Sequence, residues 1–210
     1  MNIFTLTCGP LSTNTYFVYL DGRDDCVIID PADGAMVRRT LKELGKKCTH
    51  ILLTHGHFDH IYGLKEVKDA TNATVCIHEL DAKALYSNRA SLIVLIRETL
   101  PEVHADRQLH HGDIVEAAGI KFRVIHTPGH TPGGVLYAVD DEKLAFCGDT
   151  VFYESVGRTD MPGCSTQALI ESFFDKVMPL TGYRLLPGHD EETTVAHEAQ
   201  FNPLIQHIRR

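Results

Sequence analysis

The 210-residue sequence contains no long apolar run, no basic leader and no excess of positive charge. Its longest apolar cluster, residues 92–96, is far too short to span a membrane, so we expect no membrane partner. Residues 1–4 show neither a basic segment nor the start of a long hydrophobic one, so we expect no signal peptide. The net charge of -8 disfavours contact with a phosphate backbone, and we therefore expect no nucleic-acid partner.

Paired cysteines and domain linkers are also missing. The six cysteines show no Cys-x-x-Cys spacing and mostly fall in apolar, strand-like stretches, which is typical of reduced thiols in a cytoplasmic protein. No linker, short repeat or low-complexity segment divides the chain, so residues 1–210 are expected to form one domain. A domain of this size and ordinary composition folds without a metal or disulfide, so any metal site is expected to be functional.

Strand and helix signals alternate along the chain in two similar halves. The apolar pattern predicts strands at residues 3–7, 14–20, 26–29, 51–53, 74–77, 114–117, 120–125, 135–139, 144–146 and 184–185. Helices are predicted from the cap Asp33 to about residue 44, at 61–70, between 79 and 100, at 166–177, and at the C-terminus to near Arg210. This order predicts an α/β fold in which two sheets pack face to face with helices outside, an αββα sandwich. We expect the site at one edge, between the two sheets.

Four candidate ligands directly follow the strand at residues 51–53. The stretch Thr54-His55-Gly56-His57-Phe58-Asp59-His60 places three histidines and one aspartate within six residues. Imidazole and carboxylate together suit zinc, iron or manganese, and the stretch contains no thiolate of a structural cysteine site. A loop of solvated histidines would explain one such residue but not four at this spacing.

The remaining ligands are expected at other strand ends, because one short stretch cannot surround a metal ion. His130 follows the strand at 120–125, Asp149 follows the strand at 144–146, and His189 follows the strand at 184–185. Each of the three directly follows a glycine, which is typical of a tight turn from strand to loop. These three residues complete a set of seven candidate ligands.

The pattern His55-x-His57-x-Asp59-His60, followed by His130, Asp149 and His189, resembles the signature of the metallo-β-lactamase superfamily. The resemblance runs from Asp30-Pro31 to Gly188-His189, and it implies an αββα sandwich with a two-metal site. The segments 127–133 (TPGHTPG) and 157–160 (GRTD) are most similar to the glyoxalase II branch, the hydroxyacylglutathione hydrolases, and to the related persulfide dioxygenases.

The resemblance implies two divalent metal ions, with zinc expected and iron or manganese as alternatives. The first ion would be held by His55, His57 and His130, the second by Asp59, His60 and His189, with Asp149 as the bridge. The two ions would lower the pKa of a shared water toward ~7, and the resulting hydroxide would attack a thioester carbonyl. Asp59 would orient that hydroxide and thus act as the catalytic residue.

The chain departs from the glyoxalase II branch at its C-terminus. Enzymes of that branch carry a C-terminal helical domain that helps to bind glutathione, whereas only 21 residues follow His189 here (210 minus 189). We therefore expect the short, single-domain type, acting on a small-molecule thioester of the acylglutathione class, such as S-lactoylglutathione. A monomer or a small homo-oligomer is expected.

Two other functions remain open. A mononuclear iron persulfide dioxygenase would use His55, His57 or His130 with Asp149 as a facial site, and the other three ligands would then have no role. A non-catalytic metal-binding module would fit the missing substrate domain but not the complete ligand set.

Four further features have two interpretations each. Asp30 could hydrogen-bond a ligand histidine or only end a strand. Arg158 could bind an anionic substrate group or pair with Asp160 within its loop. His126 is interpreted as a packed core histidine and not as a ligand. Residues 92–96 could roof a pocket or form a dimer contact, with core packing as the simplest interpretation.

Overall fold

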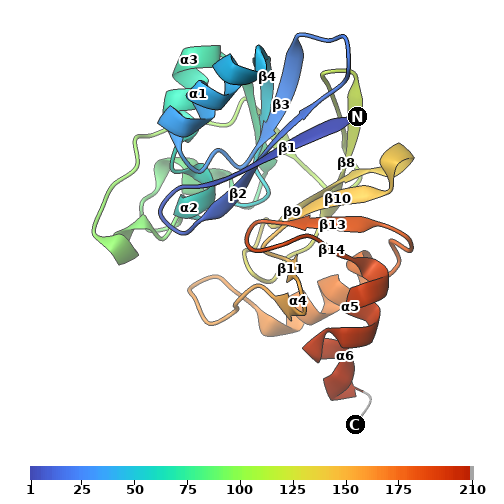
Figure 1. Cartoon of the computed structure of the whole chain (residues 1–210). Coiled ribbons are helices and arrows are strands. Elements are labelled where there is room, and N and C mark those ends of the chain that lie inside the picture. Colours follow the sequence, from blue (N-terminus) through green and yellow to red (C-terminus); the bar gives the residue numbers. More distant parts are fainter. Residues whose placement is uncertain (209–210) are drawn as a thin grey trace.

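The computed structural model describes residues 1–208, which form two six-stranded sheets that face each other with helices on their outer sides (Figure 1). The first sheet has the order β1 (Asn2–Cys8), β2 (Thr13–Tyr19), β3 (Asp25–Ile29), β4 (Lys47–Leu52), β5 (Thr74–His78), β6 (Arg107–Leu109). The second has the order β14 (Thr193–Thr194), β13 (Arg184–Pro187), β10 (Leu144–Gly148), β9 (Val135–Val139), β8 (Ile120–His126), β7 (Ile114–Ala117). The predicted αββα sandwich is confirmed.

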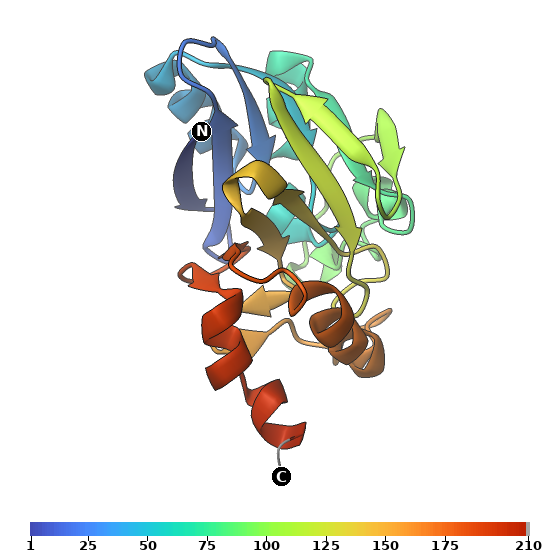
Figure 2. The same ribbon diagram turned by 90° about the vertical axis from the view of Figure 1, so that its right-hand side faces the viewer.

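The helices divide between the two outer faces. On the first sheet lie α1 (Gly34–Leu44) and α3 (Leu64–Thr71), and on the second lie α4 (Thr166–Ser172), α5 (Val195–Phe201) and α6 (Pro203–Ile208). In both ribbon views the red C-terminal helices lie far from α1 and α3 (Figures 1 and 2). Within residues 1–208 no helix is long and apolar enough to cross a membrane.

The central strands are buried on both faces, which explains why they appear as unbroken apolar runs. In β3, Val27 and Ile29 belong to the core between the sheets, whereas Cys26 and Ile28 pack under α1 and α3. The three layers of core therefore hold the strand ends of both sheets in fixed positions relative to each other.

The helix caps decide where α1 and α3 begin and end. Asp33 accepts a hydrogen bond from the backbone nitrogen of Met36 (2.8 Å), so the predicted cap of α1 is confirmed, and Gly45, with a φ of 64°, ends the helix. The helix predicted at 61–70 is interrupted at Gly63, which donates to the carbonyl of Pro31 (2.9 Å). A Cβ at Gly63 would overlap the backbone at Gly34, so this contact separates the short helix α2 (Phe58–Ile61) from α3.

The segment between residues 79 and 100 differs from the prediction. It contains two 3₁₀ turns, Ala82–Tyr86 and Ile93–Ile96, in place of α-helices. Leu92 and Arg97 have φ values of 64° and 61°, and a left-handed residue on each side prevents the second turn from extending into an α-helix.

Four short strands were not predicted, and one helix has a different form. The additional strands are β6, β14 and the hairpin of β11 (Val151–Phe152) with β12 (Ser155–Val156), which lies in the loop after β10. The helix predicted at 166–177 is α4 followed by a π-helical turn at Phe173–Val177. The predicted end of the last helix near Arg210 lies outside the described residues.

Candidate metal centre

The seven candidate ligands come from strand ends that meet at one edge of the sandwich, and they are buried or nearly so. They are His55 and His57 in the loop after β4, Asp59 and His60 in α2, His130 after β8, Asp149 after β10, and His189 after β13. The first four come from the first sheet and the last three from the second, so both halves of the chain build the site.

Their donor atoms form three overlapping groups, and within each group the atoms lie within 4.8 Å of one another. The groups are His55–His57–His130, His55–His60–Asp149 and Asp59–His60–His189. The first and third coincide with the two ligand sets that the family resemblance implies. The Asp149 Oδ2 atom lies 3.3 Å from His130 Nε2 and 3.6 Å from His189 Nε2, so this carboxylate lies between the two ends.

Three buried atoms of this cluster have no hydrogen-bond partner among the described residues: His55 Nε2, His60 Nε2 and Asp149 Oδ1. The last two lie 3.2 Å apart. Buried polar atoms without partners are rare because each costs free energy, whereas a bound cation would satisfy all three. Imidazole nitrogens and carboxylate oxygens are donors that suit zinc, iron or manganese. The residues present therefore fit divalent metal ions.

Strand β2 fixes the turn that carries His189. The backbone nitrogen of Asn14 donates to the carbonyl of Gly188 (2.7 Å), and the Tyr16 hydroxyl donates to the carbonyl of Pro187 (2.6 Å). A Cβ at Gly188 would overlap Asp149 Oδ1 and the ring of His60. Glycine at this position therefore lets the donors converge.

At one end of the cluster the pKa values of two histidines, His55 and His57, are lowered. Burial, together with the neighbouring imidazoles, lowers the pKa of His55 well below its usual value. Burial and the adjacent His130 lower the pKa of His57 to about 3. A neutral imidazole is the form that binds a metal ion, so these side chains need release no proton when they do so.

The other end attracts positive charge. Burial alone would lower the pKa of His60, but the nearby Asp149 and Asp59 raise it well above its usual value. The pKa of His189 is raised as well, because Asp59 and Asp149 outweigh burial. Burial would raise the pKa of Asp59, but His60 and His189 lower it overall. Two carboxylates at this end thus favour a cation, which is either a proton on the histidines or a metal ion.

Asp30 holds one ligand in the orientation that metal binding requires. Its Oδ2 lies 2.8 Å from His60 Nδ1 and accepts from Thr54 Oγ1 (2.6 Å), while its Oδ1 accepts from the Thr54 backbone nitrogen (2.8 Å). An ionised carboxylate only accepts, so Nδ1 of His60 carries the proton and Nε2 faces the cluster. Of the two interpretations of Asp30, the hydrogen bond to a ligand histidine is confirmed.

Two more ligands are oriented in a similar way. Nδ1 of His130 donates to the backbone carbonyl of Arg158 (2.8 Å), which leaves Nε2 facing the cluster. The Thr13 hydroxyl donates to Asp59 Oδ2 (3.1 Å). The ligand positions therefore depend on partners in β2 and in the loop after β10, as well as on their own strands.

Asp81 is a functional candidate that the sequence did not reveal. Its buried carboxylate accepts from the backbone nitrogen of Gly56 (2.9 Å), between the first two ligand histidines, and from that of Gly133 (2.7 Å), three residues past His130. Burial raises its pKa. Asp81 thus ties together the two ligand loops that come from different sheets. Its position three residues past β5 resembles that of the ligands, but it carries no flanking glycine or histidine.

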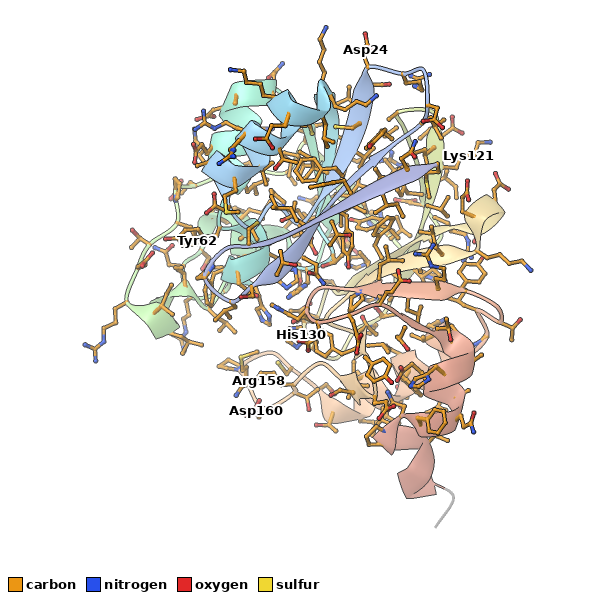
Figure 3. The ribbon with its side chains drawn as sticks, viewed as in Figure 1. Asp24, Tyr62, Lys121, His130, Arg158 and Asp160 are labelled. Carbon is orange, nitrogen blue, oxygen red and sulfur yellow. The ribbon has the colours of Figure 1, made fainter. Side chains whose placement is uncertain are left out.

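The Arg158 side chain pairs with Asp160 through two hydrogen bonds of 2.7 and 2.8 Å. Figure 3 shows the two residues side by side on the loop beneath His130. The ion pair within the loop is therefore confirmed, and binding of an anionic substrate stays a prediction. His126 stacks on His78 with ring centroids 4.0 Å apart and belongs to none of the three donor groups, so it is a packed histidine and not a candidate ligand, although it is half-buried and lies outside the core.

Cysteine makes no disulfide in the described part of the chain, and five of the six thiols are buried.

The metal-ligand cluster opens into a cavity of about 470 Å³, whose other lining residues are mostly apolar. A cavity of that volume is of the size that binds small molecules.

Comparisons with known proteins agree with this geometry. The family model of the metallo-beta-lactamase superfamily matches residues 8–193. The probable metallo-hydrolase YqgX of Bacillus subtilis (strain 168) is 34% identical over 202 residues, which cover 94% of each chain. The hydroxyacylglutathione hydrolase GloC of Haemophilus influenzae is 31% identical over 212 residues, which cover 98% of each chain.

Solved structures match over nearly the whole chain. BLEG-1, described as a B3 metallo-beta-lactamase, has a TM-score of 0.92 at 32% identity and covers 97% of this chain and 99% of its own. TTHA1623 in a di-iron-bound form has a TM-score of 0.84 at 33% identity, with coverages of 95% and 98%. ETHE1 from Myxococcus xanthus has a TM-score of 0.80 at 28% identity, with coverages of 99% and 89%.

Proposed function

The chain belongs to the metallo-β-lactamase superfamily, and from this membership we propose that it is a dinuclear metal-dependent hydrolase that cleaves a thioester of the acylglutathione class. The observation that carries the dinuclear proposal is that two of the donor groups, His55–His57–His130 and Asp59–His60–His189, share no residue, so the cluster offers two separate sets of three donors. Zinc is the metal we propose, with iron or manganese as alternatives, and the di-iron form of TTHA1623 supports two ions. We also propose a cytoplasmic location, where free thiols stay reduced.

The thioester proposal rests on the relative GloC, which is named a hydroxyacylglutathione hydrolase. The alignment covers 98% of both chains, so that relative is about as long as this one and has no room for a large additional domain. The short C-terminal part of this chain therefore does not argue against glutathione as the thiol.

Two divalent ions bound by this cluster would supply a hydroxide nucleophile at neutral pH and polarise the carbonyl oxygen. The protein's own residues orient the reaction. In this proposal Asp59, whose carboxylate accepts a hydrogen bond from Thr13, would also accept one from the attacking water and thereby fix its direction. Asp30 keeps the proton of His60 on Nδ1, so the lone pair of Nε2 stays available. A thiolate leaves without protonation because a thiol ionises near pH ~8.5, so the site needs no separate acid.

A second candidate is hydrolysis of a β-lactam, favoured by the TM-score of 0.92 with BLEG-1. Such a reaction expels an amine nitrogen, which is a poorer leaving group than a thiolate and needs a proton. The described lining of the cavity offers no lysine or tyrosine that could donate one. We therefore place the β-lactam second.

One set of assays separates these functions. Zinc-loaded and iron-loaded protein is given S-lactoylglutathione, a chromogenic cephalosporin, and glutathione persulfide, each with and without oxygen. The proposal predicts release of thiol at the same rate in both atmospheres. Hydrolysis of the cephalosporin alone would support the β-lactam function, and oxygen uptake with the persulfide alone would support the dioxygenase. A protein that binds metal but turns over none of the three would support the non-catalytic module.

A further inference from the structure

The cavity next to the metal centre has a wall of apolar side chains. Five of the candidate ligands line its floor. The wall contains Leu11, Leu92, Leu95, Ile96, Phe152 and Met161. These side chains come from the β1–β2 loop, from the second 3₁₀ turn and from the loop after β10, so both halves of the chain contribute.

Several of these side chains are open to solvent although they are large and apolar. Leu95 is 65% exposed, Leu11 is 52% exposed and Ile96 is 37% exposed. Single exposed leucines are ordinary on protein surfaces, but a group that shares one cavity wall marks a binding site. Contact with an apolar ligand would remove this surface from water.

The wall is fixed in place before any ligand binds. The backbone nitrogen of Phe58 donates to the carbonyl of Ser91 (2.8 Å), which ties the 3₁₀ segment to the ligand helix α2. Met161, from the loop after β10, packs against the cluster of Phe58, Leu92 and Ile93. The two halves of the wall therefore contact each other beside the metal centre, and little ordering is needed on binding.

The charges around the cavity indicate which part of a thioester enters it. Apart from histidines, the described lining residues include one cation, Arg158, whose guanidinium is already paired with Asp160. A peptide thiol such as glutathione carries several charges, and burying them against leucine would be costly. The thiol moiety therefore fits the open, Arg158 side of the cavity, and the apolar wall is left for the acyl group.

We propose that this wall is an acyl-binding site and that the preferred substrate carries an apolar acyl chain of several carbons instead of a short hydroxyacyl group. The inference rests on the proposed thioester hydrolysis and concerns the acyl side of that substrate.

The proposal is tested by measuring kcat/KM of the zinc-loaded protein for a series of acyl thioesters. Acetyl, butanoyl and hexanoyl thioesters of glutathione are compared with the lactoyl thioester. Each methylene that leaves water against the wall should raise kcat/KM about two- to fourfold, so hexanoyl, with three more carbons than lactoyl, should exceed it about 8- to 64-fold. A kcat/KM that is flat or falls with chain length would overturn the proposal.

A pair of neighbouring variants tests the location. Leu95→Gln keeps the size of the side chain but removes its apolar end, whereas Val94→Gln makes a similar change at a residue that is 49% exposed and does not line the cavity. Leu95→Gln should lower kcat/KM for the hexanoyl thioester about tenfold and leave the acetyl thioester nearly unchanged. Val94→Gln should behave as wild type with both. Equal losses in the two variants would refute the assignment of the wall.

A binding measurement separates this inference from the proposed function. The chain contains no tryptophan, so Leu95→Trp introduces a single fluorescent reporter at an exposed position of the wall. Octanoate should shift its emission at concentrations at least tenfold lower than lactate does. If no thioester is hydrolysed but octanoate binds, the proposed reaction fails and the acyl site stands. If thioesters are hydrolysed but octanoate and lactate behave alike, the acyl site fails and the reaction stands.

Discussion

Replacing Asp30 by asparagine should disable one metal ligand without touching a ligand residue. The Asp30 carboxylate faces three groups, at 2.8 Å from the Thr54 nitrogen, 2.6 Å from the Thr54 hydroxyl and 2.8 Å from His60 Nδ1. An asparagine oxygen can satisfy the Thr54 nitrogen, but its amide then faces His60 as a donor. His60 must respond by moving its proton to Nε2, and that nitrogen can no longer bind a metal ion.

The expected loss is a 10- to 100-fold weaker affinity for the ion at the Asp59–His60–His189 group, as is usual when the partner of a ligand histidine is changed. The metal-free variant should also lose about 1.5–3 kcal/mol of unfolding free energy, the magnitude of one hydrogen bond to a charged group. Backbone strain should not contribute, because Asp30 has a φ of 52° and asparagine tolerates this left-handed region.

Competition with a chromophoric zinc chelator measures the affinity for each of the two zinc ions. Denaturation in urea with EDTA measures the unfolding free energy of the metal-free protein. Asp33→Asn is the matched control, because Asp33 only caps α1 and asparagine caps equally well. If Asp30→Asn binds both zinc ions as tightly as wild type does, Asp30 does not set the tautomer of His60 and the reasoning is wrong.

Four further outcomes are expected. Asp59→Asn, saturated with metal, should keep far less kcat than its occupancy explains, since the amide cannot orient the nucleophile as the carboxylate does; wild-type kcat would exclude that role. Asp81→Asn leaves one buried backbone N–H facing an amide donor, so urea denaturation should show a loss of about 1–3 kcal/mol, together with weaker zinc binding. Arg158→Ala should raise KM severalfold for an anionic thioester with kcat little changed, and an uncharged thioester should not respond; equal effects would assign Arg158 to the loop alone. In metal-free protein the raised pKa values of His60 and His189 stabilise the fold fully below about pH 6.5, and this contribution is lost as pH rises through their folded pKa values, so Tm measured with EDTA should fall from pH 6.5 to 9.

The seven candidate ligands could be grouped from the sequence because each one occupies a position with a local signal. His130, Asp149 and His189 each follow an apolar strand and a glycine, and such turns have the same appearance in any fold. Asp81 lacked that signal. Its role depends on Gly56 and Gly133 approaching it from two different loops, which no local pattern encodes.

The same distinction explains the errors in secondary structure. Residues 92–96 are apolar enough for a helix, but Leu92 and Arg97 adopt left-handed conformations that place the segment against the cavity. β6 has three residues and exists through its parallel pairing with β5, which is a tertiary contact. Gly63 interrupts the predicted helix because of a close approach to Gly34 from another segment.

Whether two metal ions act together in hydrolysis can be measured by a metal titration of activity. Metal-free protein receives zinc in steps, and anaerobic release of thiol from an acylglutathione is measured at each step. If two ions act together, activity should reach its plateau at two equivalents of zinc per chain. A plateau at one equivalent, or no thiol release at any zinc content, would contradict it.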